Sequence, residues 1–349
     1  MNNNHRSKVK LGRIVLLLLM AASALHGEGR SANVPVAATR TSRALTGKVI
    51  CLDPGHGGTA ETDGYRVGPM GEREEWINLR VAKELKAMLE ARGASVVMTR
   101  MSDTSVALKD RAMLAIGHHA DLFLSIHHNA TADTTANFPI VYFHGNASEN
   151  RASVDLGRSV IQSLARRLFK NRTPVSLVSD HTIFPESGAA VLRHSYGIPG
   201  IISEASFFTN GREERRLKDS SYNHREAEAL LAGLTAYFSR RHAGIRERYS
   251  LAKIPPFRAY QESARMGDTA RFWHVFYLKA KKKFNEGTMA SRREAFRLFA
   301  ASARSFPDSY AARDCHRYLS LLAAARDTAF SRNERLRVRE FYVRVRHGR

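Results

Sequence analysis

Cysteine is scarce in this chain of 349 residues, which contains only Cys51 and Cys315. A small fold held together by disulfides needs several cysteine pairs, so the composition excludes that class of protein. Cys51 falls in a predicted core strand and Cys315 in a distant helical region. We therefore expect two buried free thiols; their oxidation in an exported protein is the alternative.

A long apolar run is also missing. The run at 14–22 is shorter than the roughly 20 apolar residues that span a bilayer. It follows four basic residues and precedes small residues up to Gly27, which is the pattern of a secretory signal peptide. We expect residues 1–27 to be such a peptide and the protein to be exported to the periplasm or cell envelope; an uncleaved membrane anchor is the alternative. No cysteine follows the run, which argues against a lipoprotein.

Acidic side chains are in short supply, with 33 Asp and Glu against 55 Lys and Arg and a formal net charge of +22. The excess is concentrated in residues 241–349, which hold 25 basic and 10 acidic residues, so the last third reads as a basic appendage. Such a surface favours an anionic partner, and export makes an envelope polymer or phospholipid headgroups better candidates than nucleic acid. A solvated helical surface without a ligand is the alternative.

Strand and helix patterns alternate from Gly47 onward, and the 43% apolar content is that of a globular protein. This order predicts an α/β fold, with a mostly parallel twisted sheet flanked by helices. The expected strands cover 48–52, 95–99, 121–126, 140–143 and 198–203, and the expected helices cover 78–92, 108–119, 152–170 and 222–241.

An all-α C-terminal region is predicted beyond His242. Pro255 and Pro256 mark a linker, and helical patterns follow at 269–285, 291–305, 309–326 and 331–346. Their lengths suit either tetratricopeptide-like helix pairs, which could bind a protein partner, or a plain bundle.

The predicted organisation is a signal peptide at 1–27, a linker at 28–46, a catalytic domain at 47–241, a linker at 242–262 and a basic helical domain at 263–349.

Chemically active side chains follow three of the predicted strands. His56 lies in a glycine-rich turn after the first strand, His127 follows the strand at 121–126, and Glu204 follows the strand at 198–203. An acidic cluster, Glu72, Glu74 and Glu75, lies between the two histidines. Two imidazoles and a carboxylate can hold a catalytic zinc ion with one position open for water, and a further carboxylate can act as general base.

Each of these features alone has an ordinary structural interpretation. A histidine after a strand is commonly a loop or capping residue, and acidic residues at a helix start suit the helix dipole. The glycine-rich turn is not followed by Gly-Lys-Ser/Thr, which excludes a phosphate-binding loop. Their shared position at strand ends favours a catalytic site.

Six motifs give the chain a resemblance to a known family. They are Leu52-Asp53-Pro54-Gly55-His56-Gly57-Gly58, Glu74-Glu75-Trp76-Ile77-Asn78-Leu79, Thr99-Arg100, Ser125-Ile126-His127-His128-Asn129-Ala130, Val191-Leu192-Arg193 and Glu204-Ala205-Ser206-Phe207-Phe208-Thr209-Asn210. In this order, over about residues 47–240, they resemble the zinc-dependent N-acetylmuramoyl-L-alanine amidases of the Amidase_3 type. The resemblance implies hydrolysis of the amide between N-acetylmuramic acid and L-alanine in peptidoglycan, for cell-wall remodelling, daughter-cell separation or recycling.

The resemblance also implies roles for single residues. His56, Glu74 and His127 match the Zn²⁺ ligands, and Glu204 matches the catalytic glutamate. Glu74 stands four residues before the Asn78-Leu79 pair, as the family's ligand does, and Glu72 and Glu75 remain alternatives. Arg193 and Asn129 match positions near the substrate.

The chain departs from the family at His128 and Ser206, where small residues and glycine are usual. We interpret His128 as a neutral substitution; a spare polar contact near the metal is the alternative. The stretch from Phe143 to Val191 is too short for the helix that plugs the site in some relatives, which predicts a constitutively open site. Two rival functions remain: another zinc peptidoglycan peptidase on the same scaffold, or an envelope-binding protein without activity.

Overall fold

A computed structural model describes residues 43–59, 66–169, 173–246, 253–257 and 267–345. The predicted signal peptide and most of the first linker lie outside these residues, as do parts of the second linker. Among the described helices, none combines the length and apolarity that crossing a membrane requires.

Seven strands form one sheet in the order β2-β1-β3-β6-β4-β5-β7. Four neighbouring pairs are parallel, while β4 runs antiparallel to β6 and β7 antiparallel to β5, so the prediction of a mostly parallel sheet is confirmed. The strands are β1 (Val49–Pro54), β2 (Ser95–Met98), β3 (Leu122–Asn129), β4 (Ile140–Phe143), β5 (Ser176–Ser179), β6 (Gly200–Phe207) and β7 (Tyr342–Val343).

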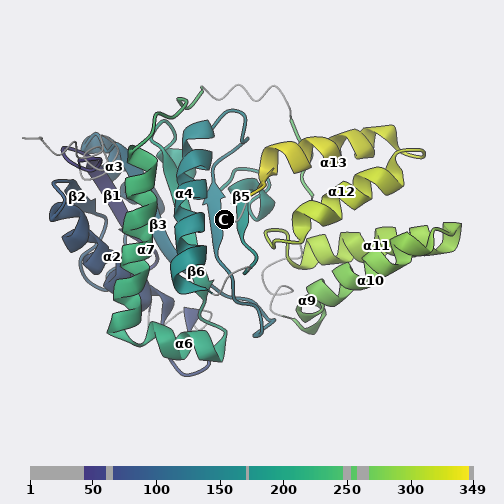
Figure 1. Cartoon of the computed structure of the whole chain (residues 1–349), viewed down its shortest axis with the longest axis horizontal. Helices are drawn as coiled ribbons and strands as arrows, with labels where there is room; N and C mark the ends of the chain where they lie inside the picture. Colours follow the sequence, from purple (N-terminus) through teal and green to yellow (C-terminus); the bar gives the residue numbers. More distant parts are fainter. Residues whose placement is uncertain (1–42, 60–65, 170–172, 247–252, 258–266, 346–349) are drawn as a thin grey trace, which may run out of the picture.

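Helices cover both faces of the sheet (Figure 1). On one face lie α2, α4 and α7, and on the other lie α3, α5 and the C-terminal helices. The described helices are α2 (Glu74–Glu90), α3 (Leu108–Gly117), α4 (Arg151–Leu168), η2 (Asp180–Thr182), α5 (Ala190–His194), α6 (Gly211–Leu217), α7 (Ser220–Phe238), α9 (Asp268–Arg271), α10 (Trp273–Glu286), α11 (Met289–Ser305), α12 (Ala312–Ala323) and α13 (Thr328–Phe341).

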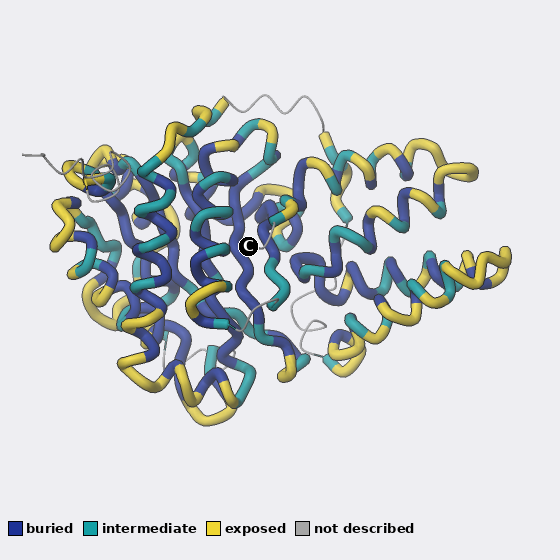
Figure 2. Tube along the Cα trace, in the orientation of Figure 1, coloured by how far each residue is buried: buried dark blue, intermediate teal, exposed yellow. Residues whose placement is uncertain are grey.

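Strand alternation divides the core into two layers. Val141 and Phe143 of β4 point into the layer under α2, α4 and α7, whereas Ile140 and Tyr142 point into the opposite layer. Successive side chains of a strand face opposite sides of the sheet. Because both sides of β4 are covered, all four of its side chains must be largely apolar. Figure 2 shows the strands and the inward helix faces as one continuous buried region.

The C-terminal helices are built into this core. Trp273 and Phe306 pack with Phe138 of the α/β unit, and the Trp273 indole N–H donates to Asp133 Oδ2 at 2.9 Å. The Tyr142 hydroxyl donates to the Asp308 carboxylate. The interpretation of the last third as an appendage is therefore wrong, because the region packs against the β4 and β5 side of the sheet and adds strand β7 to it. Its helices pack as α10 with α11 and α12 with α13, and a tetratricopeptide-like origin stays a prediction.

Several short elements differ from the sequence expectations. The last predicted helix ends at Phe341, and Tyr342 and Val343 pair with β5 as strand β7. Strand β5 and the short helices η2, α5 and α6 had no expected counterpart. Helices of three to seven residues carry too few residues for a periodic signal.

Candidate active site

The loop after β1 is held in an unusual backbone conformation. His56 has a φ of 59°, and Gly57 and Gly58 follow with φ of 116° and 71°, a region that glycine adopts without steric cost. The Arg111 guanidinium donates to the His56 carbonyl oxygen at 2.7 Å, and Arg100 donates to the Gly55 carbonyl oxygen at 2.8 Å. These two buried arginines fix the direction of the His56 side chain.

Glycine is required at position 55 because His127 lies against it. A Cβ added to Gly55 would lie 2.1 Å from Cε1 of the His127 ring. The loop therefore approaches β3 as closely as its backbone allows. This close approach brings together two histidines that are 71 residues apart in the sequence.

Glu74 lies between the two imidazoles. Its Oε1 is 3.1 Å from His56 Nε2 and 2.9 Å from His127 Nδ1. One ligand atom from each of the three side chains lies within 4.8 Å of the others. The structure thus brings together the three residues that the sequence analysis proposed as ligands.

The two alternative acidic residues are engaged elsewhere. Glu72 pairs with Arg80 at 2.7 Å, and Glu75 pairs with Arg73 at 2.6 Å. Glu74 is thus the member of the acidic cluster that joins the histidines. It can do so because α2 begins at this residue and its first turn faces the β1 loop.

The electrostatics favour neutral imidazole beside an ionised carboxylate. Burial lowers the pKa of His56, and the adjacent Glu74 offsets only part of that shift. Burial raises the pKa of Glu74, but His56 and His127 outweigh it and hold that pKa well below its usual range. Metal ligation requires neutral histidine and deprotonated carboxylate, so near neutral pH these protonation states suit a metal ion.

Glu204 projects from β6 at the position paired with His127 on β3. Both side chains line a cavity of about 420 Å³, together with His56, Glu74 and Asn129. Arg193 is absent from the lining; its Nη1 donates to the carbonyl oxygens of Ser187 and Gly188 beside the cavity. Its proposed contact with substrate stays a prediction.

The cavity is not filled by a helix among the described residues of the stretch from 143 to 191. That stretch contributes Ile183, Phe184 and Ala189 to Val191 to the lining, while its long helix α4 packs on the opposite face of the sheet against α7. An open site is compatible with this arrangement, and its independence of an activator stays a prediction.

The interpretation of His128 as a neutral substitution missed a buried network. Its Nδ1 lies 2.9 Å from Asn78 Oδ1 and its Nε2 lies 3.0 Å from Glu226 Oε2. Asn78 Nδ2 and the His128 backbone N–H each donate to Glu74 Oε1 at 3.3 Å. His128 therefore supports, from behind, the carboxylate that joins the two imidazoles. The signal was strand alternation, which turns His128 toward α2 and α7 when His127 faces the cavity.

The donor set fits a metal ion of borderline softness. Two imidazole nitrogens and one carboxylate oxygen converge at the edge of a cavity that has room for water and substrate. Asn78 and His128 donate hydrogen bonds to Glu74, which is the kind of outer contact that orients metal ligands in proteins.

Comparison with known proteins agrees with this site. The family model described as N-acetylmuramoyl-L-alanine amidase (Amidase_3) matches residues 50–236. The chain is 28% identical over 233 residues to the N-acetylmuramoyl-L-alanine amidase AmiA of Salmonella typhimurium, covering 57% of this chain and 79% of that protein. It is 33% identical over 207 residues to a probable cell wall amidase, LytH, of Staphylococcus epidermidis, covering 59% and 64%.

A solved amidase from Clostridium difficile aligns with 29% identity and a TM-score of 0.47, covering 55% of this chain and 97% of that structure. The family match spans more than half of the chain and includes every residue of the His56, Glu74, His127 and Glu204 constellation. Proteins of this family are in general metal-dependent, and they hydrolyse the amide between N-acetylmuramic acid and L-alanine in peptidoglycan. The chain belongs to the Amidase_3 family and is an N-acetylmuramoyl-L-alanine amidase.

Proposed function

We propose that the metal is Zn²⁺ and that His56 Nε2, His127 Nδ1 and a Glu74 oxygen hold it. The convergence of these three atoms at the cavity is the observation that carries the proposal. Nitrogen-rich sets of this kind suit zinc, whereas Mg²⁺ and Ca²⁺ prefer oxygen ligands.

The chain's own residues would divide the reaction between them. When bound, Zn²⁺ lowers the pKa of a coordinated water toward about 7 and polarises the scissile carbonyl. Glu204 accepts the proton of the attacking water and returns it to the alanine nitrogen, which leaves as an amine. Its place beside His127 on the neighbouring strand supports this role. Asn129, in the cavity lining, and Arg193, beside it, would bind the sugar-peptide substrate.

Substitution of Glu204 by glutamine tests the assignment. We expect Glu204→Gln to keep its zinc and to lose about 10²-fold or more of its turnover, because the amide cannot accept the proton. Zinc content by mass spectrometry and release of stem peptides from purified sacculi are the measurements. Near wild-type release by the glutamine variant would remove Glu204 from the mechanism.

We further propose that the amidase acts in the cell envelope after export and that residues 47–241 form its catalytic domain. The basic and apolar pattern of residues 1–27 supports export. The family match at 50–236 supports the domain limits.

Analysis of the reaction products separates the amidase from a zinc peptidase that cuts within the stem peptide, since the amidase releases a complete stem peptide with an amino-terminal L-alanine.

A further inference from the structure

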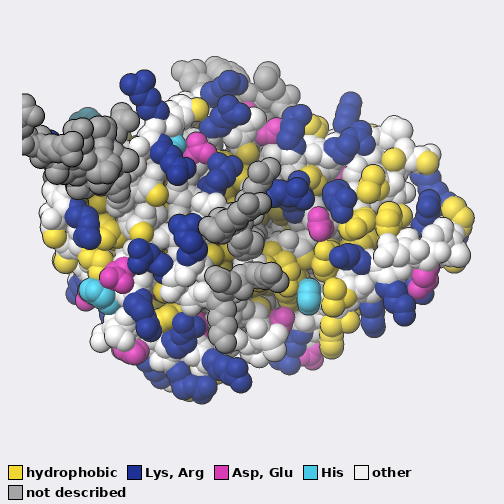
Figure 3. Space-filling model, viewed as in Figure 1, with side chains coloured by type: hydrophobic (Ala, Val, Ile, Leu, Met, Phe, Trp, Pro, Cys, Tyr) yellow, Lys and Arg dark blue, Asp and Glu magenta, His cyan; other side chains and the backbone are white. Residues whose placement is uncertain are grey.

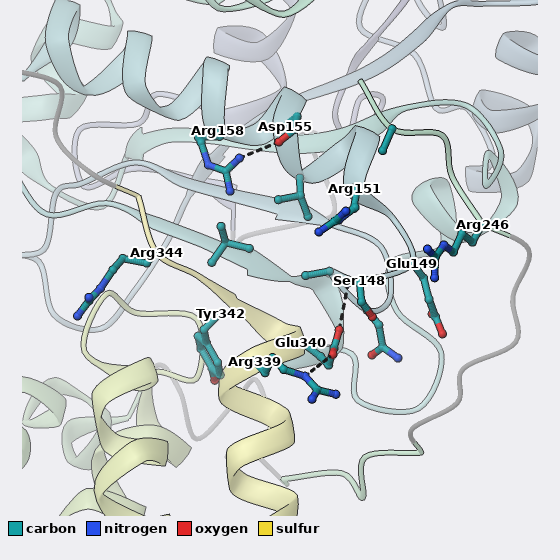
Figure 4. Close-up of a pocket in the computed structure, with 15 residues that line it drawn as sticks. Ser148, Glu149, Arg151, Asp155, Arg158, Arg246, Arg339, Glu340, Tyr342 and Arg344 are labelled. Carbon is teal, nitrogen blue, oxygen red and sulfur yellow. Dashed lines mark hydrogen bonds and ion pairs between the residues drawn. The ribbon is translucent and has the colours of Figure 1, made fainter. Parts of the chain in front are cut away.

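A second cavity lies where the C-terminal segment meets the α/β unit. It has a volume of about 1060 Å³ and is lined by residues of α4, of the segments after β4 and α7, and of α13 and β7. Five arginines line it: Arg151, Arg158, Arg246, Arg339 and Arg344. Figure 4 shows their side chains arranged around the space between these elements.

The acidic residues of the lining neutralise only part of this charge. Asp155 pairs with Arg158 at 2.7 Å, and Glu340 pairs with Arg339 at 2.7 Å. Glu149 is the third acidic residue, against three further arginines. No carboxylate of the described residues forms an ion pair with Arg151, Arg246 or Arg344, all of which are exposed.

The backbone around these arginines is ordered by hydrogen bonds. The Arg246 N–H donates to the Glu149 carbonyl oxygen at 3.0 Å, and the Tyr196 hydroxyl donates to the Arg246 carbonyl oxygen at 2.9 Å. The Ser148 N–H donates to Glu340 Oε2 at 3.0 Å, which joins the segment after β4 to α13. The guanidinium groups thus project from fixed points on three separate parts of the chain.

The second cavity and the active site lie toward opposite ends of β4. Ile140, at the start of β4, pairs with Glu204, whereas the second cavity includes the residues that follow Phe143 at its end. A ligand in the second cavity therefore leaves the active site free. Figure 3 shows that Lys and Arg side chains outnumber acidic ones over the visible face of the molecule.

We propose that this cavity is a second, non-catalytic peptidoglycan site that takes the carboxylate-rich stem peptide of a strand that is not being cut. Guanidinium groups bind carboxylates through paired hydrogen bonds, and the cavity has the size of a peptide site. The inference rests on peptidoglycan being the substrate. Holding a polymer at two points raises the effective concentration of the scissile bond at the active site. The C-terminal region would then serve to complete this cavity.

The test compares two double variants of the full-length protein in the Glu204→Gln background. Arg151→Ala with Arg344→Ala removes two arginines of the cavity. Arg166→Ala with Arg332→Ala removes the same charge from exposed positions outside it. The probe is purified stem peptide at physiological ionic strength, with the same peptide amidated at its carboxylates as the negative control. Retention on sacculi with and without phosphate polymers is measured in parallel.

We expect the cavity variant to bind the stem peptide about tenfold more weakly than the parent, and the other double variant to bind it like the parent. The amidated peptide should bind to none of the three proteins. Equal binding by both double variants would overturn the proposal, as would an equal loss in both. A loss confined to walls that carry phosphate polymer would overturn it in favour of a phosphate ligand. Binding is measured without turnover, so failure of the zinc mechanism would show separately in the activity of the wild type.

Discussion

Two clusters of the described residues each combine two histidines with one carboxylate. One is His56, Glu74 and His127, and the other is His144, Asp180 and His181. In both, one ligand atom from each side chain lies within 4.8 Å of the others. Of the two, the first lines the active-site cavity, so the pair separates the effect of cavity access from that of ligand spacing.

The second cluster uses its carboxylate to hold backbone. Asp180 Oδ2 accepts from the Ala189 N–H at 2.7 Å and lies 2.8 Å from His144 Nδ1, while Oδ1 accepts from the Gly145 N–H at 3.3 Å. The His181 ring stacks on Phe341 at the end of α13. This cluster therefore joins the loops after β4 and β5 to the C-terminal helix.

The carboxylate of the first cluster is also held by hydrogen bonds, because Glu74 Oε1 accepts from Asn78 Nδ2 and from the His128 backbone N–H at 3.3 Å. The two clusters therefore differ mainly in what surrounds them: the first lines a cavity, whereas the second lies between packed loops and α13. We infer that close ligand atoms are not sufficient for a metal site, which also needs access for the ion and its substrate.

The largest expected effect is the loss of metal from His127→Ala. With one of three ligands removed, we expect metal content to fall from about one ion per chain toward zero and amidase activity to fall by about 10³-fold or more. His181→Ala in the second cluster is the matched control and should keep its metal. Equal loss of metal in both variants would show that the two clusters do not differ as proposed.

A smaller effect is expected from Asn78→Ala, which removes the amide donor to Glu74. Outer-shell partners of metal ligands typically contribute 10- to 100-fold in metal affinity, and we expect a weakening in that range by chelator competition. Asn150→Ala is the control, since Asn150 is a buried asparagine that donates to the His144 carbonyl oxygen. Unchanged affinity in Asn78→Ala would show that the network behind Glu74 is not needed for binding.

Asp180→Asn should affect stability and leave the metal in place. The amide group would present a donor where the carboxylate accepts from N–H groups, so we expect the free energy of unfolding to fall by about 2 kcal/mol. Urea unfolding measures this change, with the highly exposed Asp268→Asn as a control expected to stay within about 0.5 kcal/mol. Loss of metal at unchanged stability would identify the second cluster as a metal site after all.

The smallest effect concerns the two cysteines, which are buried and belong to neither cluster. Burial, with a further contribution from Asp53, raises the pKa of the Cys51 thiol to about 12, and burial raises that of Cys315 to about 12. We expect neither thiol to react with a disulfide reagent at pH 8 in the native protein, and both to react in denaturant. Rapid native labelling of either one would contradict the described burial.

The same thiols predict a loss of stability at alkaline pH. The unfolded chain releases their protons above pH about 9, whereas the folded protein keeps them, so the unfolded state binds fewer protons and stability falls as pH rises. Each thiol contributes a slope of about 1.4 kcal/mol per pH unit between 9 and 12. Unfolding measured at pH 8 and pH 10 should show a smaller difference after Cys315→Ala.

Much of the site was predictable because its signals are local. His56, His127 and Glu204 each belong to a strand end or to the turn after it, and apolar runs and glycine turns reveal strands in short windows. The resemblance supplied Glu74 through its distance from Asn78. The boundaries were less accurate: β3 and β6 continue through His127 and Glu204, because pairing with neighbouring strands extends them.

Other features depend on contacts between distant segments, which no local pattern contains. The arginines that hold the β1 loop, the pairing of His128 with Glu226, and the addition of Tyr342 and Val343 to the sheet are of this kind. By itself, the sequence determined the α/β order and the residue types of the metal site. Only the tertiary structure decided which of two similar clusters faces a cavity, because access depends on what packs around a side chain.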